Sequence, residues 1–374
     1  MEKKPTKYEL WLDSIVIYFG GNIEDKYDVG VDMFTEFWWG EIWYAFDPFC
    51  RGEITFMEAF LAHYKCMFIV YFAFFQIMAV MSTAFITLGE RSIIADYQGR
   101  KGPRKTGSSG FLQPIADALK LLLKEKISVR FIQEHVFTIA TWAALFVSFI
   151  LWLLLPLGLD TYLLSLDFTS FFLINIGILH IFAIVFASWS SNSKYAFLGG
   201  FRSAAQMVSY ELCIGLSLGV IFKYSKNLSV IAADYFGTEV GSFVYYLVGL
   251  AIIFFIASLA ELNRHPFDLP EAEAELVAGY NVEYTGIRFA LFFLAEYLSV
   301  VYYSVLFNKL YIGESCYLSV NLVNIAAIIY LIITLRTLIP RYRYDQLMRI
   351  NWKCFLPILV VSAAFLTLLE FLLT

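Results

Sequence analysis

Six carboxylates are concentrated in one short stretch, residues 261–283, between two long apolar runs. They are Glu261, Asp268, Glu271, Glu273, Glu275 and Glu283. Arg264 is the one permanent cation in the stretch, and His265 can also carry a positive charge. We interpret this excess of negative charge as the mark of a segment that handles protons or cations. The alternative is an acidic, solvated loop.

A short helix is the element that would position these acids. Asp268 followed three residues later by Glu271 forms a capping box, with Pro270 in the first turn and Gly279 as the stop. Glu271 and Glu275 would then share one face, where like charges at this spacing destabilise a helix by about 0.2–0.5 kcal/mol. A helix shaped only for stability would not carry this pair, so the pattern favours a functional role.

Composition places the chain among membrane proteins. Of its 374 residues 60% are apolar and 16% are charged, which excludes a disordered chain and disfavours an ordinary soluble one. Eight apolar runs approach the about 20 residues that cross a bilayer. They lie near residues 67–88, 136–157, 168–189, 205–222, 242–260, 289–307, 317–339 and 354–373.

These runs predict an all-α, polytopic membrane protein with eight transmembrane helices and amphipathic interfacial helices. Residues 1–66 form an N-terminal extension suited to a membrane surface or a subunit contact, and residues 67–374 form the membrane domain. The connections after the second, fourth and sixth spans hold few bases, namely Lys223, Lys226 and Lys309. Most other Lys and Arg follow the odd-numbered spans, so those connections face the negative side of the membrane. We see no signal or transit peptide.

The sequence predicts no redox centre and no metal site in this chain. None of the five cysteines belongs to a CxxC pair, so no iron–sulfur or zinc pattern is present. His180 is the one histidine in the middle of a span, and we interpret it as a packed side chain rather than a ligand. Electrons for any redox reaction would therefore come from a partner.

The connection between the first two spans, residues 90–135, predicts a turn-rich, non-helical loop, because it holds several glycines and bases. It would contact lipid headgroups or dock a soluble partner. A helix begins near Pro114 within it. Its polar residues form one stripe on an apolar cylinder, which indicates a helix lying along the membrane interface; they are Gln113, Asp117, Lys120 and Lys124.

Carboxylates also lie within the predicted spans. Glu211 is a few residues inside the fourth span, Glu296 is near the middle of the sixth, and Glu90 ends the first. A carboxylate in such a place costs several kcal/mol unless it is paired, hydrated or protonated. A proton relay is the functional hypothesis, and a structural hydrogen bond between helices is the alternative.

Several long stretches, taken together, resemble one family: subunit 1 of the proton-pumping NADH:quinone oxidoreductase, respiratory complex I. The stretches are GERSIIADYQGRKGPRKTGSSGFLQPIADALKLLLKE, ASWSSNSKYAFLGGFRSAAQMVSYE, ELNRHPFDLPEAEAELVAGYNVEYTGIRFALFFLAEY and LRTLIPRYRYDQLMRINWKCFLP. The similarity covers about residues 67–374. The sequence departs from the family pattern at Ser92, Arg104 and Arg288, which puts the detailed shape of the channel mouth and docking loop in question.

The resemblance implies a membrane subunit that builds much of the ubiquinone chamber, in the mitochondrial inner membrane or, as an alternative, a bacterial plasma membrane. Ubiquinone would be the substrate, and NAD, FMN and iron–sulfur clusters would lie in partner subunits of the complex. The implied quinone-channel residues are Arg91, Asp117, Arg264, Phe289, Phe293 and Arg336. The implied proton-coupling residues are Tyr210, Glu211, Glu261, Asp268, Glu271, Glu273, Glu275, Glu283 and Glu296.

Two other functions fit parts of the sequence. A stand-alone proton or cation transporter would be active when purified alone, but no Lys lies within a predicted span and the acids gather at one side. A membrane anchor of a related hydrogenase-type complex would differ in the subunits and cofactors that purify with it.

Overall fold

The computed structural model describes residues 56–125, 132–155, 169–225, 244–268, 279–313 and 318–373, and within them the chain is helical without a strand. Most of the N-terminal extension and the predicted capping-box helix, with Glu271, Glu273 and Glu275, lie outside the described residues. The chain divides into two units, Met1–Ala73 and Phe74–Thr374. Every contact discussed below lies within the second unit.

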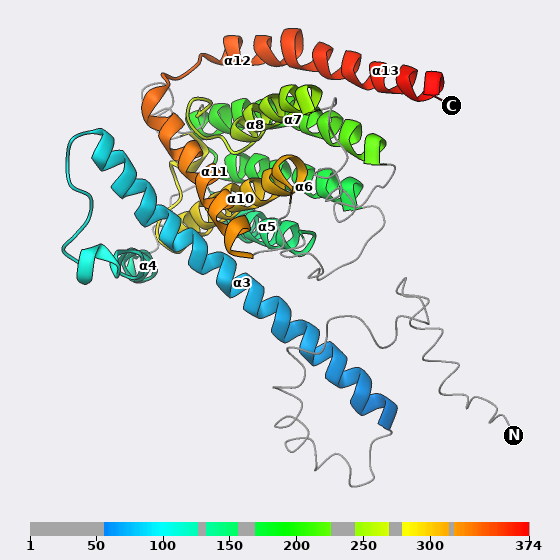
Figure 1. The fold of residues 1–374 in the computed structure, drawn as a ribbon. Helices are drawn as coiled ribbons and strands as arrows, with labels where there is room; N and C mark the ends of the chain where they lie inside the picture. Colours follow the sequence, from blue (N-terminus) through cyan, green and yellow to red (C-terminus); the bar gives the residue numbers. More distant parts are fainter. Residues whose placement is uncertain are drawn as a thin grey trace, which may run out of the picture. The chain divides into compact units, whose positions relative to one another are not determined.

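Eight long helices form the described part of the chain (Figure 1). They are α3 (Phe56–Tyr97), α5 (Glu134–Leu153), α6 (Thr169–Ser190), α7 (Lys194–Ser225), α8 (Val244–Glu261), α10 (Ile287–Phe307), α11 (Leu318–Leu338) and α13 (Leu356–Leu373). Two shorter helices join them, α4 (Gln113–Leu123) and α12 (Tyr344–Ile350). Short 3₁₀ turns occur at Ser108–Gly110 and Gly279–Asn281, and π-helical segments at Asn308–Ile312 and Asn351–Phe355.

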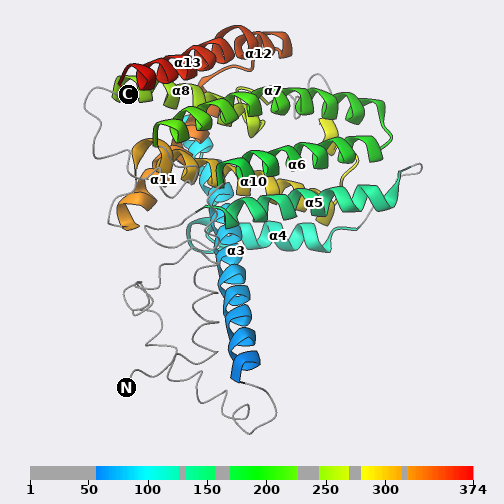
Figure 2. The ribbon, with the colours of Figure 1, turned by 90° about the vertical axis from the view of Figure 1, so that its right-hand side faces the viewer.

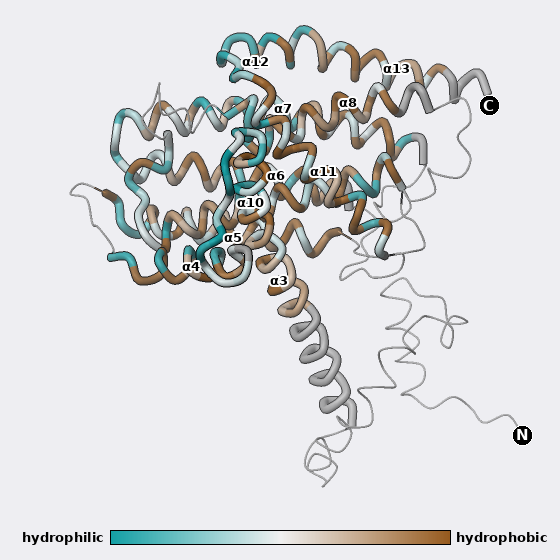
Figure 3. Tube along the Cα trace, turned by 60° about the vertical axis from the view of Figure 1, so that its left-hand side comes forward, coloured by the Kyte–Doolittle hydropathy of each residue, from teal (hydrophilic) through white to brown (hydrophobic). Residues whose placement is uncertain are grey.

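The predicted all-α membrane class is confirmed. Seven helical stretches in the described residues are long and apolar enough to cross a membrane, and Val248–Glu261 of α8 is a shorter apolar helix at the fifth predicted span. Figure 3 shows hydrophobic residues along most of α5 to α8 and hydrophilic residues at helix ends and connections. The predicted helix near Pro114 is confirmed as α4, which carries proline in its first turn.

Two predicted loops were wrong at one end, because a helix continues into each polar stretch. Helix α3 runs to Tyr97, so Glu90 and Arg91 are helical and do not lie in a loop. Helix α7 begins at Lys194, inside the predicted loop between the third and fourth spans. Helical structure also precedes the last predicted span, in α12. Hydropathy marks the residues that cross the apolar layer, whereas a helix ends only where its backbone hydrogen bonds end.

The core of the second unit is built from α5, α6, α7, α8 and α10. Along this series α5 packs on α6 and on α10, α6 on α7, and α7 on α8. Figures 1 and 2 show α5, α6 and α7 running side by side. Polar side chains fix the pairs: Trp152 Nε1 of α5 donates to the Leu298 carbonyl of α10 at 3.3 Å. At the other end of the chain, Asn351 Nδ2 donates to the Ser209 carbonyl of α7 at 2.6 Å.

Two adjacent glycines of α7 allow close approaches, Gly200 to α6 and Gly199 to the 3₁₀ turn at Gly279. A Cβ atom on Gly200 would lie 2.2 Å from Ser188 Oγ of α6, and a Cβ on Gly199 would lie 2.8 Å from the Gly279 Cα. Small residues allow helix backbones to approach in this way within a membrane. This approach positions α6 and α7, which carry several of the site residues described below.

We expect Gly200→Ala to destabilise the assembled protein by about 1–3 kcal/mol, because the added methyl group overpacks a closed contact. The matched control is Gly219→Ala on the same helix, where a Cβ atom would meet nothing within 4 Å. The amount of assembled complex on native gels and its midpoint of thermal inactivation would measure the difference. Equal values for the two variants would contradict the close packing.

Candidate functional site

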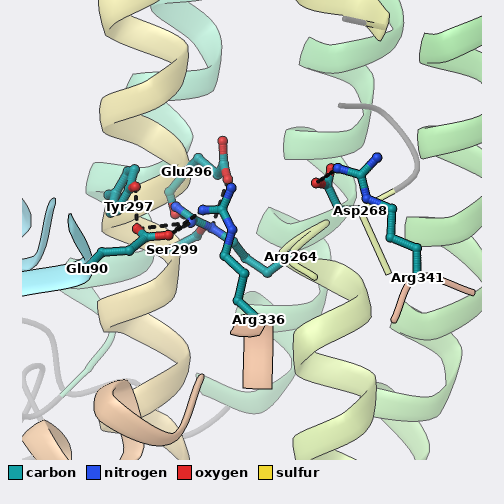
Figure 4. A network of polar contacts seen from close by, with 8 residues as sticks. All are labelled: Glu90, Arg264, Asp268, Glu296, Tyr297, Ser299, Arg336 and Arg341. Carbon is teal, nitrogen blue, oxygen red and sulfur yellow. Dashed lines mark hydrogen bonds and ion pairs between the residues drawn. The ribbon is translucent and has the colours of Figure 1, made fainter. Parts of the chain in front are cut away.

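A buried carboxylate, Glu90 of α3, is the centre of the site (Figure 4). Its side chain is 5% exposed. Its Oε1 accepts hydrogen bonds from Arg264 Nη1, at 3.0 Å, and from Arg336 Nη1, and its Oε2 accepts one from the Tyr297 hydroxyl at 2.5 Å. The donors come from the turn after α8, from α11 and from α10. One carboxylate therefore ties together four segments that are far apart in the sequence.

Arg264 extends this cluster to a second carboxylate. Its Nε lies 3.0 Å from Glu296 Oε1, and its guanidinium carbon lies 4.2 Å from the centre of the Tyr297 ring. Burial opposes the charged form, but the carboxylates of Glu296 and Glu90 raise the pKa of Arg264 well above its ordinary value. The two carboxylates and the two guanidiniums, Arg264 and Arg336, balance in charge.

A separate ion pair lies farther along the turn after α8. Arg341 Nη2 donates to Asp268 Oδ2 at 3.1 Å, and Asp268 is buried (Figure 4). Burial lowers the pKa of the neighbouring His265, and the charge of Arg341 lowers it further. The neutral form of His265 is therefore favoured, and Arg264 is the permanent cation of this turn.

A cavity of about 540 Å³ lies on one side of Glu90. Three of the predicted quinone-channel residues line it, Arg91, Phe293 and Arg336, and a fourth, Arg264, reaches it through Glu90. The other two lie one contact away: Asp117 accepts a hydrogen bond from Arg91 Nη1 at 2.6 Å, and the Phe289 ring stacks on Phe293 at 5.9 Å. The volume falls in the range of about 300–1,000 Å³ typical of small-molecule sites.

A second, much smaller cavity, of about 20 Å³, lies beyond Arg264. Its walls include Glu261 at the end of α8, Glu296 of α10, and His180 of α6. Oε2 of Glu261 and Oε1 of Glu211 are both buried and have no hydrogen-bond partner among the described residues. Glu211 lies against α6, since a Cβ atom on Gly177 would be 2.8 Å from its Oε1.

Of the predicted proton-coupling residues, the structure brings Glu261 and Glu296 to one cavity and places Glu211 against the same helix, α6, that contributes His180 to it. Tyr210 precedes Glu211 in α7 but is directed elsewhere, because its hydroxyl donates to the Leu347 carbonyl at 3.1 Å. Its position indicates that it anchors α7 to α12. Glu283 is partly buried in the turn before α10. In the described residues no group of three or more His, Cys, Asp or Glu side chains is placed to hold a metal ion.

Glu90 and Tyr297 were missing from the predicted site residues. In the sequence Glu90 is one of the carboxylates within the predicted spans, at the end of the first, and Tyr297 is one of many aromatic residues. The carboxylate of Glu90 is itself the feature that could identify the site from the sequence, since a charge within an apolar helix requires a partner. No linear pattern identifies that partner, because Arg264, Tyr297 and Arg336 lie 174, 207 and 246 residues away along the chain.

The three departures from the family pattern lie outside the Glu90 cluster. Ser92 Oγ donates to the Gly89 carbonyl within α3 at 2.8 Å. Arg288 Nη2 lies 3.4 Å from Glu134 Oε1 and its guanidinium lies over the Phe137 ring. Arg104 is exposed. None of the three lines the cavity of about 540 Å³.

Comparison with known proteins covers most of the chain. The family described as NADH dehydrogenase matches residues 69–367. NADH-ubiquinone oxidoreductase chain 1 of Arabidopsis thaliana is 43% identical over 300 residues, which cover 75% of this chain and 89% of that protein. The corresponding protein of Dictyostelium citrinum is 42% identical over 279 residues, covering 74% of this chain and 86% of the relative.

A third relative shows the same likeness. An NADH-quinone oxidoreductase subunit from Wolbachia pipientis wMel is 39% identical over 316 residues, covering 77% of this chain and 92% of that protein. The range matched by the family includes Glu90, both arginines of its cluster and both cavities. With its apolar helices, this chain therefore belongs to the NADH dehydrogenase family, as a multi-pass membrane subunit of the NADH-ubiquinone oxidoreductase chain 1 type.

Proposed function

We propose that this chain forms much of the ubiquinone channel of respiratory complex I and couples quinone reduction to proton translocation through its buried carboxylates. One observation carries the proposal: the Glu90 cluster lies between two cavities. Glu90, Tyr297 and Arg336 line the larger one, and Arg264 joins them to Glu296, which lines the smaller one with Glu261.

The larger cavity suits the head of a quinone. Aromatic and aliphatic side chains on its walls, such as Phe293 and Ile94, would cover an apolar ring and the start of its tail. Arg91 and Arg336 offer hydrogen-bond donors to the quinone oxygens. Reduction takes two electrons and two protons, and the electrons would come from NADH through FMN and iron–sulfur clusters in partner subunits.

The coupling rests on the charge balance around Arg264. Two unit charges about 4 Å apart interact by about 4 kcal/mol at the effective dielectric constant near a protein surface. A negative charge that develops on a quinone beside Arg336 would therefore compete with Glu90 for the arginines. The loss of that balance would change the proton affinity of Glu296, and Glu296 shares the smaller cavity with Glu261.

The same proposal places the protein among other subunits. Neighbouring membrane subunits and the peripheral-arm subunits of the quinone site would be its partners, with lipid around the exposed apolar faces. The exposed loop before α4 offers the bases Lys101, Arg104 and Lys105 for such a contact.

The mitochondrial inner membrane is the proposed location of the protein. A bacterial plasma membrane is the alternative, and cell fractionation would distinguish the two. Glu271, Glu273, Glu275 and Glu283 are proposed to continue the acidic pathway.

We expect Arg264→Ala to lower quinone-linked turnover strongly, because it leaves Glu296 without its ion-pair partner and Glu90 with one arginine instead of two. Removing one partner of a buried ion pair costs about 3–5 kcal/mol. Turnover with NADH and a short-chain quinone would be measured in membranes. Reduction of an artificial acceptor upstream of the quinone serves as the assembly control, and Arg349→Gln, on the exposed face of α12, as the matched variant. Unchanged quinone kinetics would contradict the proposal.

We expect Glu211→Gln to slow proton translocation while the complex still assembles. The amide has nearly the shape of the carboxylate, so packing against Gly177 is preserved, but it cannot gain and lose a proton. Proton uptake would be followed with a pH-sensitive dye in sealed vesicles during NADH oxidation. Normal translocation in this variant would exclude Glu211 from the pathway.

We expect Phe293→Trp to raise the apparent KM for quinone more than it lowers kcat, since a larger ring narrows the cavity of about 540 Å³ and leaves every carboxylate and arginine in place. Leu322→Trp on an exposed face of α11 is the matched control. A fall in kcat at constant KM would argue that Phe293 does not lie on the path of the quinone.

A further inference from the structure

His180 of α6 lies on the wall of the small cavity, beside the two carboxylates Glu261 and Glu296. Glu261 is 6% exposed, and its Oε2, like Asn263 Oδ1, has no hydrogen-bond partner among the described residues. Buried polar atoms are normally satisfied by protein or by ordered water. The cavity of about 20 Å³ exceeds the about 10–15 Å³ that one water requires. The site therefore has both the room and the polar partners for a bound water.

One face of α6 meets both buried carboxylates. Gly177 lies three residues before His180, and residues at this spacing share a helix face. At Gly177 the helix contacts Glu211, whose Oε1 would be 2.8 Å from an added Cβ atom. One turn later, His180 reaches the cavity of Glu261. Glu211 and the cavity of Glu261 therefore lie along the same face of α6.

We propose that His180 is an additional relay residue of the acidic pathway, joined through a water in the small cavity to Glu261 and Glu296. This inference rests on the proposed function, because it adds a member to the pathway described there. A neutral imidazole offers one donor and one acceptor. A protonated carboxylate can pass its proton to the water while the water gives one to a ring nitrogen, and the other ring nitrogen gives its proton to the second carboxylate. The water is restored, the ring is again neutral and only its tautomer has changed.

The competing explanation is a histidine that fills space, which was the interpretation from the sequence. The two explanations order the same variants differently. For a space-filling ring, His180→Ala should be worse than His180→Leu, because Ala leaves the larger void. For a relay residue the order is reversed, because Leu closes the site to water, whereas Ala makes room for further waters that can continue the hydrogen-bonded link.

The test uses the assembled complex in sealed membrane vesicles, with NADH-driven quinone turnover and proton uptake measured together. We expect His180→Leu to lower turnover about tenfold, equivalent to about 1.4 kcal/mol in activation free energy. His180→Ala and His180→Gln should retain more than His180→Leu. Asn175→Leu, an exposed polar position on the same helix, is the matched control and should keep normal turnover. Electron transfer to an artificial acceptor upstream of the quinone reports assembly.

His180→Leu with turnover equal to that of the control would overturn the assignment, as would His180→Ala slower than His180→Leu. If His180→Leu does not assemble, His180→Met replaces it, and loss of assembly in both would show that the ring serves folding instead. Glu211→Gln and Arg264→Ala are measured in parallel. If those two slow turnover and His180→Leu does not, only the role of His180 is wrong, whereas normal turnover in all three would refute the acidic pathway itself.

Discussion

The second unit of this protein depends on the neutralisation of one buried carboxylate. Glu90 lies in a helix otherwise suited to lipid, and a lone charge there would cost several kcal/mol. Two arginines and a tyrosine hydroxyl satisfy it, and each comes from a different segment. Removal of Glu90 would leave two arginines without their shared partner, and removal of an arginine would leave Glu90 less compensated. The positions of α3, α10, α11 and the turn after α8 are therefore coupled.

The same requirement produces the geometry on which the proposed function depends. Arg264 binds Glu90 of α3 and Glu296 of α10 at once, so both carboxylates must lie within reach of one guanidinium. Glu90, Tyr297 and Arg336 line the large cavity, and Arg264 joins Glu90 to Glu296, which lines the small one. In the proposed mechanism, a charge that develops in the large cavity would change the proton affinity of Glu296 by electrostatics, without a large movement of the backbone.

Close packing between helices sets the distances between α6, α7 and the carboxylate of Glu211. Gly199 and Gly200 bring α7 against α6 and the turn at Gly279, and Gly177 leaves room on α6 for the carboxylate of Glu211. Van der Waals packing of small residues is the interaction available to helices in lipid, where apolar surface gains little from association. The scaffold and the acidic groups thus use the same helix faces.

The sequence alone determined the class of the protein and most of its helices, because the length of an apolar run is a direct consequence of bilayer thickness. It also identified Arg264, Glu261 and Glu296, since charges beside or within such runs are conspicuous. Only the tertiary structure decided that Glu90 is central, that Tyr210 is directed away from Glu211, and that His180 shares a cavity with two acids. Those facts depend on which helix faces meet, and contacts between residues hundreds of positions apart leave no trace in local periodicity.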